Sequence, residues 1–322
     1  MAPRIRVRVV REPEYWGALL ARVREPHITQ AWAYGEAKQA AVGYSTQRNA
    51  VDAGGWRARR LVFERAGAPV AMCQLLDKSL LGVRPAARAN RGPLFLGAPS
   101  PADVAETYRA LADRRTHRSG VLVIAPALPD GAAGAAVLRA AGFRPRGVPG
   151  WSSFSLDLTL SEDDLLARMA SDWRRQLRIA ERAGLELLVS GSPEAVERTV
   201  AGHERNMAEK GFTSPPAALV RALAGAAPRD LVVFEALLAG EPVAGILVYR
   251  FGVGAEYYVG WMAPAARPAR AARFLYWQAA LELRRRGCRR LDLGGMRPGA
   301  TEIIKKQMGG RAYTLLEEHV AY

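Results

Sequence analysis

Two lysines close to the end of an apparent strand are the residues of this sequence that most suggest chemistry. The stretch LDLGGMRPGATEIIKKQMGG (291–310) runs from an apolar strand into paired glycines and then into a short helix that carries Lys305 and Lys306. On this helix Lys305 flanks the apolar face, whereas Lys306 points toward water. The apolar face is formed by Ile303, Ile304 and Met308. A lysine held at a strand end presents a positive charge to an anionic substrate; the alternative is a solvated lysine pair after a glycine turn.

Asp292 and the glycines that follow it admit two interpretations. The aspartate could act as a general base, but a strand-end aspartate before glycines more commonly accepts backbone N–H bonds and shapes the turn. Gly294 and Gly295 allow a close approach of the backbone, either to a substrate or to a neighbouring strand. The four histidines are scattered, and Cys73 and Cys288 have no spacing that would bind zinc. We therefore expect no metal site and no Ser-His-Asp constellation.

The composition favours an anionic partner. Lys and Arg number 46 against 31 Asp and Glu, which gives a net charge of +15. This charge suits a nucleic acid, a phosphorylated metabolite or an anionic lipid.

An arginine-rich helical segment follows a capping box of Ser161 and Asp164. Its apolar stripe consists of Leu165, Leu166, Met169, Trp173, Leu177 and Ala180. Much of its remaining surface is formed by Arg168, Arg174, Arg175, Arg178 and Arg182. These arginines form either a solvated helix face or a stripe that faces phosphates.

An internal repeat organises the elements. LVFERAGAPVAMCQLL (61–76) and VVFEALLAGEPVAGILVY (232–249) each indicate two strands joined by a glycine-containing turn. In the first half a strand at RGPLFLG, a helix over 101–116 and a strand at VLVIAP follow. The second half continues with AEYYVGW, a helix over 267–286 and RLDLGG. We therefore predict an α+β fold of two acyltransferase-like domains, residues 1–155 and 156–322, whose last strand can pack on the first domain.

Other candidate substrate-binding residues lie on these elements but belong to no recognisable motif. Lys38 follows an apparent helix start, and Arg205 and Lys210 lie in HERNMAEKGF (203–212). Tyr257 and Tyr258 lie on one strand with opposite facings, so at most one of them should face a cleft. From pattern alone, a lone lysine is more commonly solvated and a strand tyrosine more commonly belongs to the core.

The sequence suggests no membrane or export segment. MAPRIRVRVVREPEYWGALL alternates charge with valine and lacks the apolar run of a signal peptide. SGVLVIAPALPDGAAGAAVL (119–138), the most apolar stretch, is interrupted by prolines and an aspartate and is unsuited to cross a bilayer. Two isolated thiols fit a reducing compartment. We expect a cytoplasmic protein without an integral membrane span.

Five segments, in this order, resemble motifs of the Fem family of aminoacyl-tRNA-dependent peptidyltransferases, which build the cross-bridges of bacterial peptidoglycan. They are TQAWAYGEAK (29–38), NRGPLF (90–95), WRRQLRIAERAGLEL (173–187), RFLYWQAALELRRRGCRRLDLGG (273–295) and IIKKQMGG (303–310). The resemblance covers nearly the whole chain. It implies two acetyltransferase-like (GNAT) domains in tandem, without the coiled-coil arm that some members carry.

The resemblance also implies a reaction and a set of site residues. An aminoacyl-tRNA is an activated ester, so an amine can attack it without a cofactor or metal, provided that the enzyme orients both substrates and stabilises the oxyanion. The acceptor would be a peptidoglycan precursor peptide, UDP-linked or lipid-linked. Lys305 becomes the catalytic candidate, steadying the terminal tRNA phosphate or the oxyanion. The substrate-binding candidates are Lys38, Arg205, Lys210, Tyr257 and Tyr258, and the tRNA-binding candidates are Arg174, Arg175, Arg178 and Lys306. We expect a monomer.

Departures from the family pattern leave alternatives open. Ala125-Pro126 stands where the family often has Asp-Pro, so this place offers no carboxylate base, and Ile304 and Met308 replace aromatic residues beside Lys305. A natural product or another peptide is therefore an alternative acceptor. An acyl-CoA N-acyltransferase is the principal rival; its pyrophosphate loop would be RPARAA (267–272), where Arg270 replaces a glycine. The third hypothesis is a non-catalytic RNA-binding protein, although no segment of the sequence resembles an RRM or KH signature.

Overall fold

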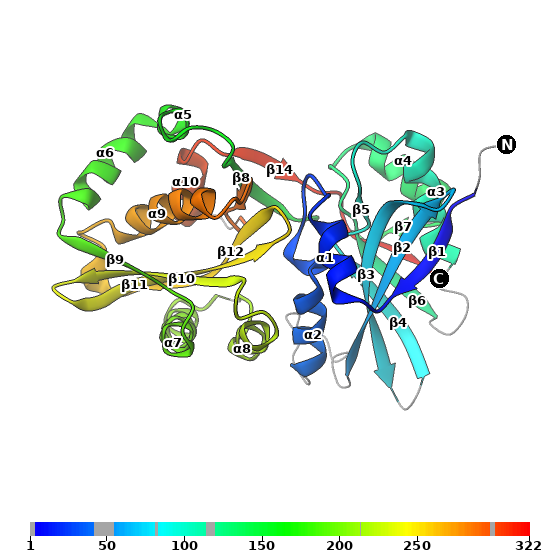
Figure 1. Ribbon diagram of the computed structural model, residues 1–322, viewed down its shortest axis with the longest axis horizontal. Coiled ribbons are helices and arrows are strands. Elements are labelled where there is room, and N and C mark those ends of the chain that lie inside the picture. Colours follow the sequence, from blue (N-terminus) through cyan, green and yellow to red (C-terminus); the bar gives the residue numbers. More distant parts are fainter. Residues whose placement is uncertain (1–3, 42–54, 81–82, 114–119, 213, 297–299) are drawn as a thin grey trace. The chain divides into compact units, whose positions relative to one another are not determined.

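The chain forms two compact units, each with one sheet and helices on both of its faces (Figure 1). The structure, a computed structural model, describes residues 4–41, 55–80, 83–113, 120–212, 214–296 and 300–322. One unit combines Met1–Ser152 with Thr314–Tyr322, and the other is Ser153–Tyr313.

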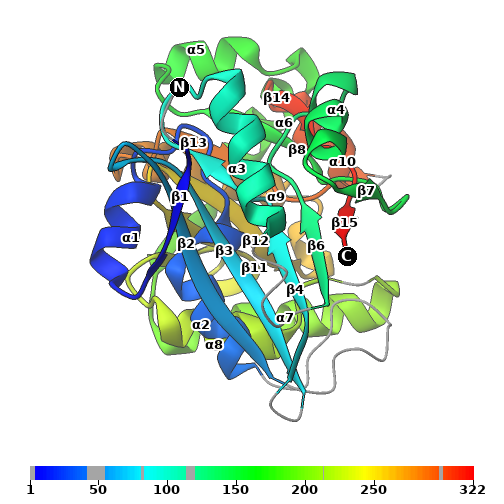
Figure 2. The same cartoon turned by 90° about the vertical axis from the view of Figure 1, so that its right-hand side faces the viewer.

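The first unit is built on an eight-stranded sheet in the order β1-β2-β3-β4-β6-β15-β7, with β5 paired to β3. Its strands are β1 (Arg6–Val10), β2 (Trp56–Arg65), β3 (Ala68–Leu80), β4 (Val83–Asn90), β5 (Leu94–Phe95), β6 (Val121–Ala125), β7 (Arg144–Pro145) and β15 (His319–Ala321). Its helices are α1 (Pro13–Leu20), η1 (Ile28–Gln30), α2 (Trp32–Ala40), α3 (Pro101–Asp113) and α4 (Ala132–Ala140). Helices α3 and α4 cover one face of the sheet, and α1 and α2 lie on the other (Figure 2).

The second unit is built on a seven-stranded sheet in the order β14-β8-β13-β12-β11-β10-β9. Its strands are β8 (Ser152–Asp157), β9 (Leu185–Ser190), β10 (Leu231–Leu238), β11 (Glu241–Phe251), β12 (Gly254–Met262), β13 (Arg290–Asp292) and β14 (Arg311–Thr314). Its helices are α5 (Glu162–Arg168), α6 (Ser171–Glu181), α7 (Pro193–Lys210), α8 (Ala217–Ala226), η4 (Pro264–Ala266), α9 (Ala271–Arg285) and α10 (Ala300–Gln307).

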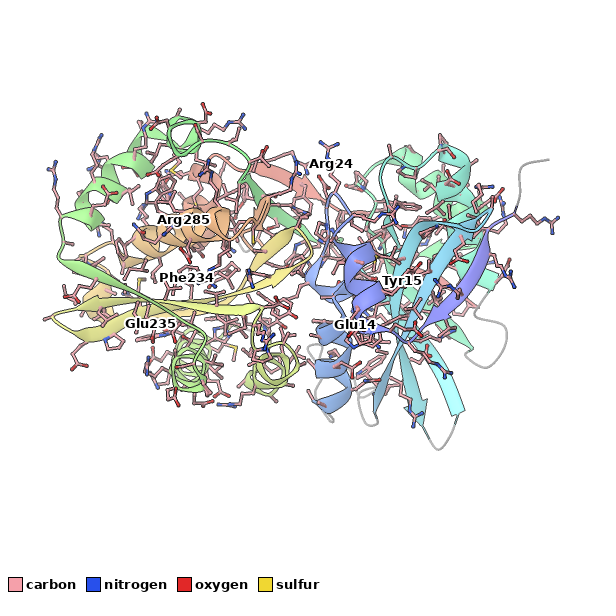
Figure 3. The ribbon with its side chains drawn as sticks, in the orientation of Figure 1. Glu14, Tyr15, Arg24, Phe234, Glu235 and Arg285 are labelled. Carbon is pink, nitrogen blue, oxygen red and sulfur yellow. The ribbon has the colours of Figure 1, made fainter. Side chains whose placement is uncertain are left out.

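Neighbouring residues of β10 show how the second sheet divides its two faces. Phe234 points into the core formed with α6 and α9, whereas Glu235 points to the side of α7 (Figure 3). There Arg198 of α7 donates to both carboxylate oxygens of the fully buried Glu235, at 3.1 and 2.6 Å. The alternation of strand side chains thus anchors helices on both faces of one sheet.

The predicted α+β fold with a duplicated unit is confirmed. In each unit an antiparallel hairpin, β2–β3 or β10–β11, precedes a third strand, β4 or β12, that is antiparallel to the second. A crossover helix, α3 or α9, then leads to a strand parallel to the third, β6 or β13.

The prediction is wrong for the third strand of the first unit. This strand is β4 rather than RGPLFLG, in which the residues Leu94–Phe95 alone form a short strand against β3. The sequence of β4, VRPAARAN, has a proline and no large apolar side chain beyond its first residue, so it lacks the usual strand pattern.

The predicted apolar stripe of residues 161–182 is buried, although the helix is broken. The backbone is extended at Met169 and Ala170, between α5 and α6. Ser161 accepts a hydrogen bond from the backbone N–H of Asp164, which confirms the N-cap half of the predicted capping box. The buried stripe residues are Leu165, Met169, Trp173, Leu177 and Ala180. Both helices therefore use the stripe to pack on the core of the second unit.

Glu318 fixes the last strand within the first unit, and this role can be tested. Its carboxylate is buried and accepts hydrogen bonds from Arg146 Nη1, at 2.8 Å, and from Arg88. We expect Glu318→Gln to lower the free energy of unfolding of this unit by about 1.5–3 kcal/mol, because hydrogen bonds to charged groups are lost. Urea unfolding and hydrogen exchange across β15 measure the effect, with exposed Glu241→Gln as the control. Equal exchange rates in Glu318→Gln and the wild type would contradict this role.

Candidate active site

The candidate site lies where β12 and β13 separate. The two strands pair in parallel over three residues each, Gly254–Glu256 against Arg290–Asp292. The register between β11 and β12 shifts at Tyr258, which is a β-bulge. Beyond Asp292 the chain turns at Gly294, whose φ is +76°. A Cβ at this position would lie 2.8 Å from the Tyr257 carbonyl oxygen, so the turn approaches β12 as closely as a glycine allows.

Lys305 of α10 is held at this turn. Its side-chain ammonium donates to the carbonyl oxygens of Gly294, at 3.3 Å, and Gly295, at 3.1 Å. The Nζ atom also lies 5.2 Å from the centroid of the Tyr257 ring, within the range of a cation–π contact. Only 3% of Lys305 is exposed, whereas Lys306 is exposed to solvent. The predicted contrast between the two lysines is confirmed.

The predicted apolar face of α10 needs one correction. Met308 is buried and Ile304 packs on the core, but Ile303 is 55% exposed. The buried side of the helix carries Ile304, Lys305 and Met308. Ile303 lies on the opposite side and is therefore exposed.

Asp292 shapes the turn that receives Lys305. Its buried carboxylate accepts hydrogen bonds from the Gly294 backbone N–H at 2.8 Å and from the Tyr313 hydroxyl. Ser153 Oγ lies 2.6 Å from Asp292 Oδ1 and 2.7 Å from the Gly294 carbonyl oxygen, so its single proton serves one of them at a time. The preferred interpretation of Asp292, as an acceptor of backbone N–H bonds, is confirmed.

The residues that support Asp292 are not evident as site residues in the sequence. Arg290 Nη2 donates to Asp292 at 3.3 Å, and Arg290 Nε donates to Ser155 Oγ at 2.6 Å. Ser153 and Ser155 alternate with Phe154 and Leu156, which belong to the apolar core. This alternation in SSFSLD is the signal that could have indicated a polar face on β8.

Tyr257 contributes the aromatic wall of the site. Its ring centroid lies 5.4 Å from that of Tyr276 on α9. Burial raises the pKa of Tyr257 to about 12, and its hydrogen bond with Tyr276 offsets part of this increase. Tyr257 is therefore neutral near pH 7 and offers Lys305 a ring face rather than a phenolate. Tyr258 is half-buried at the bulge.

The other substrate-binding candidates lie on other elements. Lys38 of α2, in the first unit, is half-buried, with its Nζ 5.9 Å from the centroid of the Trp56 ring. Arg205 and Lys210 are exposed on α7, which packs on the face of the second sheet opposite α9 (Figure 1). Lys210 Nζ donates to Asn206 Oδ1 at 3.0 Å. Of these candidates, the structure brings Tyr257 into contact with Lys305.

The arginine candidates of α6 differ from one another. Arg174 Nη1 donates to the carbonyl oxygens of Leu166 at 3.3 Å and Met169 at 2.5 Å, so this guanidinium closes the end of α5. Arg175 and Arg178 are exposed, and Arg175 forms a salt bridge of 2.6 Å with Asp172. Arg174 thus has a structural task that its position in an arginine-rich stretch did not indicate.

The described residues contain no group of three or more His, Cys, Asp or Glu that could hold a metal ion. Among the same residues, no helix combines the length and apolar character that crossing a membrane requires.

The close approach of the turn to β12 can be measured with two glycine variants. Gly294 and Gly287 both have a positive φ, +76° and +81°, but a Cβ at Gly287 would meet nothing within 4 Å. We expect Gly287→Ala to lose about 1–2 kcal/mol of stability through its backbone conformation alone. Gly294→Ala should lose more, because its Cβ also meets the Tyr257 carbonyl oxygen. Urea unfolding compares the two, and equal losses would show that the turn does not contact β12 closely.

Comparisons with known proteins bear on the fold. Residues 167–303 match the family model described as an acetyltransferase (GNAT) domain. The crystal structure of FemX is similar over 98% of this chain and 96% of its own, with a TM-score of 0.78 and 15% identity. No curated protein matches the chain.

Two further solved structures extend over nearly the whole chain. A tandem GNAT protein from the clavulanic acid biosynthesis pathway covers 99% of this chain and 98% of its own, at 16% identity and a TM-score of 0.51. A conserved protein of unknown function from Bacteroides thetaiotaomicron covers 99% of both chains, at 10% identity and a TM-score of 0.61. At these identities the likeness concerns the fold. It confirms the Fem-like resemblance at that level, and the chain is a tandem GNAT-fold protein with the architecture of FemX.

Proposed function

We propose that this protein is a cofactor-free aminoacyltransferase that moves an amino acid from aminoacyl-tRNA to the amine of a peptidoglycan precursor peptide. The observation that carries the proposal is the buried ammonium of Lys305, fixed by two carbonyl oxygens at the carboxyl end of β13. The net charge of +15 and the FemX-like fold support it. Aminoacyl-tRNA as the donor corresponds to a cytoplasmic reaction.

The proposed reaction is the aminolysis of an ester. The neutral acceptor amine attacks the ester carbonyl carbon, and a tetrahedral intermediate with a negative oxygen forms. The bond from this carbon to the ribose oxygen then breaks, an amide remains on the acceptor, and a proton from the amine ends on the ribose hydroxyl. The ester is already activated, so the protein has to position the reactants and stabilise the negative oxygen.

Lys305 is suited to this stabilisation because its charge is fixed before the reaction begins. The contacts with Gly294, Gly295 and the ring of Tyr257 restrict the ammonium to one place. A charge that is already oriented need not reorganise when the oxyanion forms, and it acts more strongly away from water. The raised pKa of Tyr257, about 12, makes this residue an unsuitable base near pH 7.

The remaining candidates are proposed as contacts to the two substrates. Lys38 is proposed to bind phosphate of the acceptor. Its Nζ atom lies over the Trp56 ring, and Lys78 Nζ lies 4.8 Å from the centroid of the same ring. The proposed further contacts to substrate are Arg205, Lys210 and Tyr258, and those to tRNA are Arg175, Arg178 and Lys306.

An acyl-CoA N-acyltransferase is the second candidate, because the GNAT domain match covers residues 167–303. A GNAT pyrophosphate loop needs backbone N–H groups that are open to the ligand at the start of a helix. Here Arg270 is the N-cap residue of α9, with φ of 54°, and its side chain donates to Gln176 Oε1 and to the Arg267 carbonyl oxygen. A bulky side chain therefore stands where glycine would leave room.

The two donors can be told apart by binding. We expect coenzyme A and acetyl-CoA to produce no saturable heat in isothermal titration calorimetry with the wild-type protein, because the Arg270 side chain crowds the start of α9. Deacylated tRNA, titrated in the same buffer, should bind. Saturable binding of acetyl-CoA without binding of tRNA would contradict the proposed donor.

The proposed reaction is tested by transfer from a pool of radiolabelled aminoacyl-tRNAs to a muropeptide precursor, with and without RNase. Label on the muropeptide that RNase abolishes would support both substrates. RNase-sensitive turnover of aminoacyl-tRNA without labelled muropeptide would contradict the acceptor alone. Label that passes from an acyl-CoA instead would contradict the donor.

In this assay Lys305→Ala should lower kcat by about 10²–10³, because it removes a preorganised charge at the oxyanion. Lys306→Ala, on the exposed side of the same helix, should raise KM for tRNA and change kcat little. Urea unfolding is the control for both variants, since Lys305→Ala also leaves two carbonyl oxygens without this donor. An unchanged kcat in a folded Lys305→Ala variant would refute the catalytic assignment.

A further inference from the structure

Three arginines gather where α9 begins and α6 packs beside it; Arg175, Arg270 and Arg273 form this arginine cluster. Arg270 Nε donates at 2.7 Å to Oε1 of Gln176, the residue that follows Arg175 in α6. Arg273 follows in the first turn of α9. The charges of Arg270 and Arg175 both contribute to lowering the pKa of Arg273, after its burial, and Asp172 opposes them. Arg273 is therefore close enough to both other guanidiniums to be repelled by them.

Acidic residues balance only part of the positive charge of the arginine cluster. Among the described residues, Asp172 is the one carboxylate that forms a salt bridge with the cluster, through Arg175 at 2.6 Å. Some other arginines of the chain have carboxylate partners of their own. Arg65, for example, pairs with both Asp103 and Glu106.

The cluster also keeps donors that the described protein does not use. Arg273 makes no side-chain hydrogen bond with the described residues, although its Nε atom is buried. A guanidinium carries five N–H donors in a planar fork that matches the oxygens of a phosphate. A phosphate beside Arg270 and Arg273 would accept these bonds and neutralise the repulsion.

We infer that the arginine cluster binds the phosphodiester backbone of RNA. This inference rests on the proposed function and specifies which surface of the second unit holds the tRNA. The charge continues along α6 with Arg178 and Arg182, both exposed. Arg175 to Arg182 spans about 10 Å of helix axis, at about 1.5 Å per residue. A row of cations of this length suits a polymer of phosphates better than a single phosphate group.

An RNA also fits this surface better than an anionic membrane. A helix that lies on a membrane presents several large apolar side chains to the acyl chains. The exposed large apolar residues among the described ones are Val9, Ile179, Leu188, Ile303 and Tyr322, which come from five different places in the chain. Ile179 alone lies on α6.

The test measures binding of fluorescently labelled, deacylated tRNA to the full chain by anisotropy at several salt concentrations. We expect the double variant R270Q/R273Q to bind at least about 10-fold more weakly and to reduce the slope of log K against log salt by about 2, because two phosphate contacts are lost. The matched control is R285Q/R286Q, which removes the same charge at the other end of α9 and should bind like the wild type (Figure 3 labels Arg285). Circular dichroism and thermal melting verify the fold of each variant.

Unchanged affinity and salt slope in R270Q/R273Q would overturn the inference, as would equal losses in the control. Binding to phosphatidylglycerol vesicles that the variant loses, while its tRNA binding persists, would overturn RNA in favour of a lipid surface. If the double variant does not fold, R273Q alone carries the same test, with a slope change of about 1.

The inference and the proposed function can fail separately. RNase-sensitive transfer that R270Q/R273Q leaves unchanged would refute the arginine cluster alone. Binding of tRNA that depends on the cluster, in a protein that transfers nothing from tRNA, would support the cluster and refute the proposed reaction.

Discussion

The buried ammonium of Lys305 is the interaction on which the rest of the site depends. A charged amine is costly to remove from water unless it meets acceptors in the protein. Lys305 meets the carbonyl oxygens of Gly294 and Gly295, and the negative face of the Tyr257 ring. These groups must stay in place for the lysine to remain buried, so the turn, strand β12 and helix α10 constrain one another.

A polar network fixes the position of the turn at Gly294. The Asp292 carboxylate accepts hydrogen bonds from the Gly294 backbone N–H, from the Ser153 hydroxyl of β8 and from the Tyr313 hydroxyl of β14. Three adjacent strands therefore converge on one carboxylate. Because β14 directly follows α10 in the chain, this contact also anchors the far end of the segment that carries Lys305. A site built in this way tolerates little change in the turn, since Ser153 and Lys305 both donate to the Gly294 carbonyl oxygen.

Sequence patterns predicted the parts of this arrangement that follow from local geometry. Helical spacing separated buried Lys305 from exposed Lys306, and a strand followed by glycines indicated the turn. Strand β4 was not predicted because its buried residues are small. Ala87 and Ala89 lie in a core whose large apolar side chains, such as Tyr108 and Phe143, come from other elements. Alanine and proline carry no strand signal of their own.

The polar network and the role of Arg174 also depend on contacts that local sequence does not encode. Ser153 and Asp292 are far apart in the chain and meet because β8 pairs with β13. Arg174 reaches the carbonyl oxygens of α5 because the helix breaks at Met169, and the continuous apolar stripe concealed this break. Long-range pairing and a break between helices are properties of the fold rather than of a short pattern.

The fold also relates the start of α9 to the turn that holds Lys305. Strands β12 and β13 are parallel, so their carboxyl ends point toward the same edge of the sheet. One leads to α9 with Arg270, and the other to the turn that holds Lys305. Met262, at the end of β12, lies six residues beyond Glu256, which pairs with Asp292. At about 3.3 Å per residue, β12 continues for about 20 Å along its own direction beyond this pairing.

Under the proposed function, a donor bound at the start of α9 extends along β12 toward Lys305. In a pyrophosphate loop the grip comes from backbone N–H groups, which require a slender ligand close to the chain. Guanidiniums at Arg270 and Arg273 project farther from the backbone and suit a wider polyanion. Under the proposed function, an arginine in place of the loop glycine therefore holds the anion farther from the backbone. In this proposal the side chains at the start of α9, rather than the fold, select the donor.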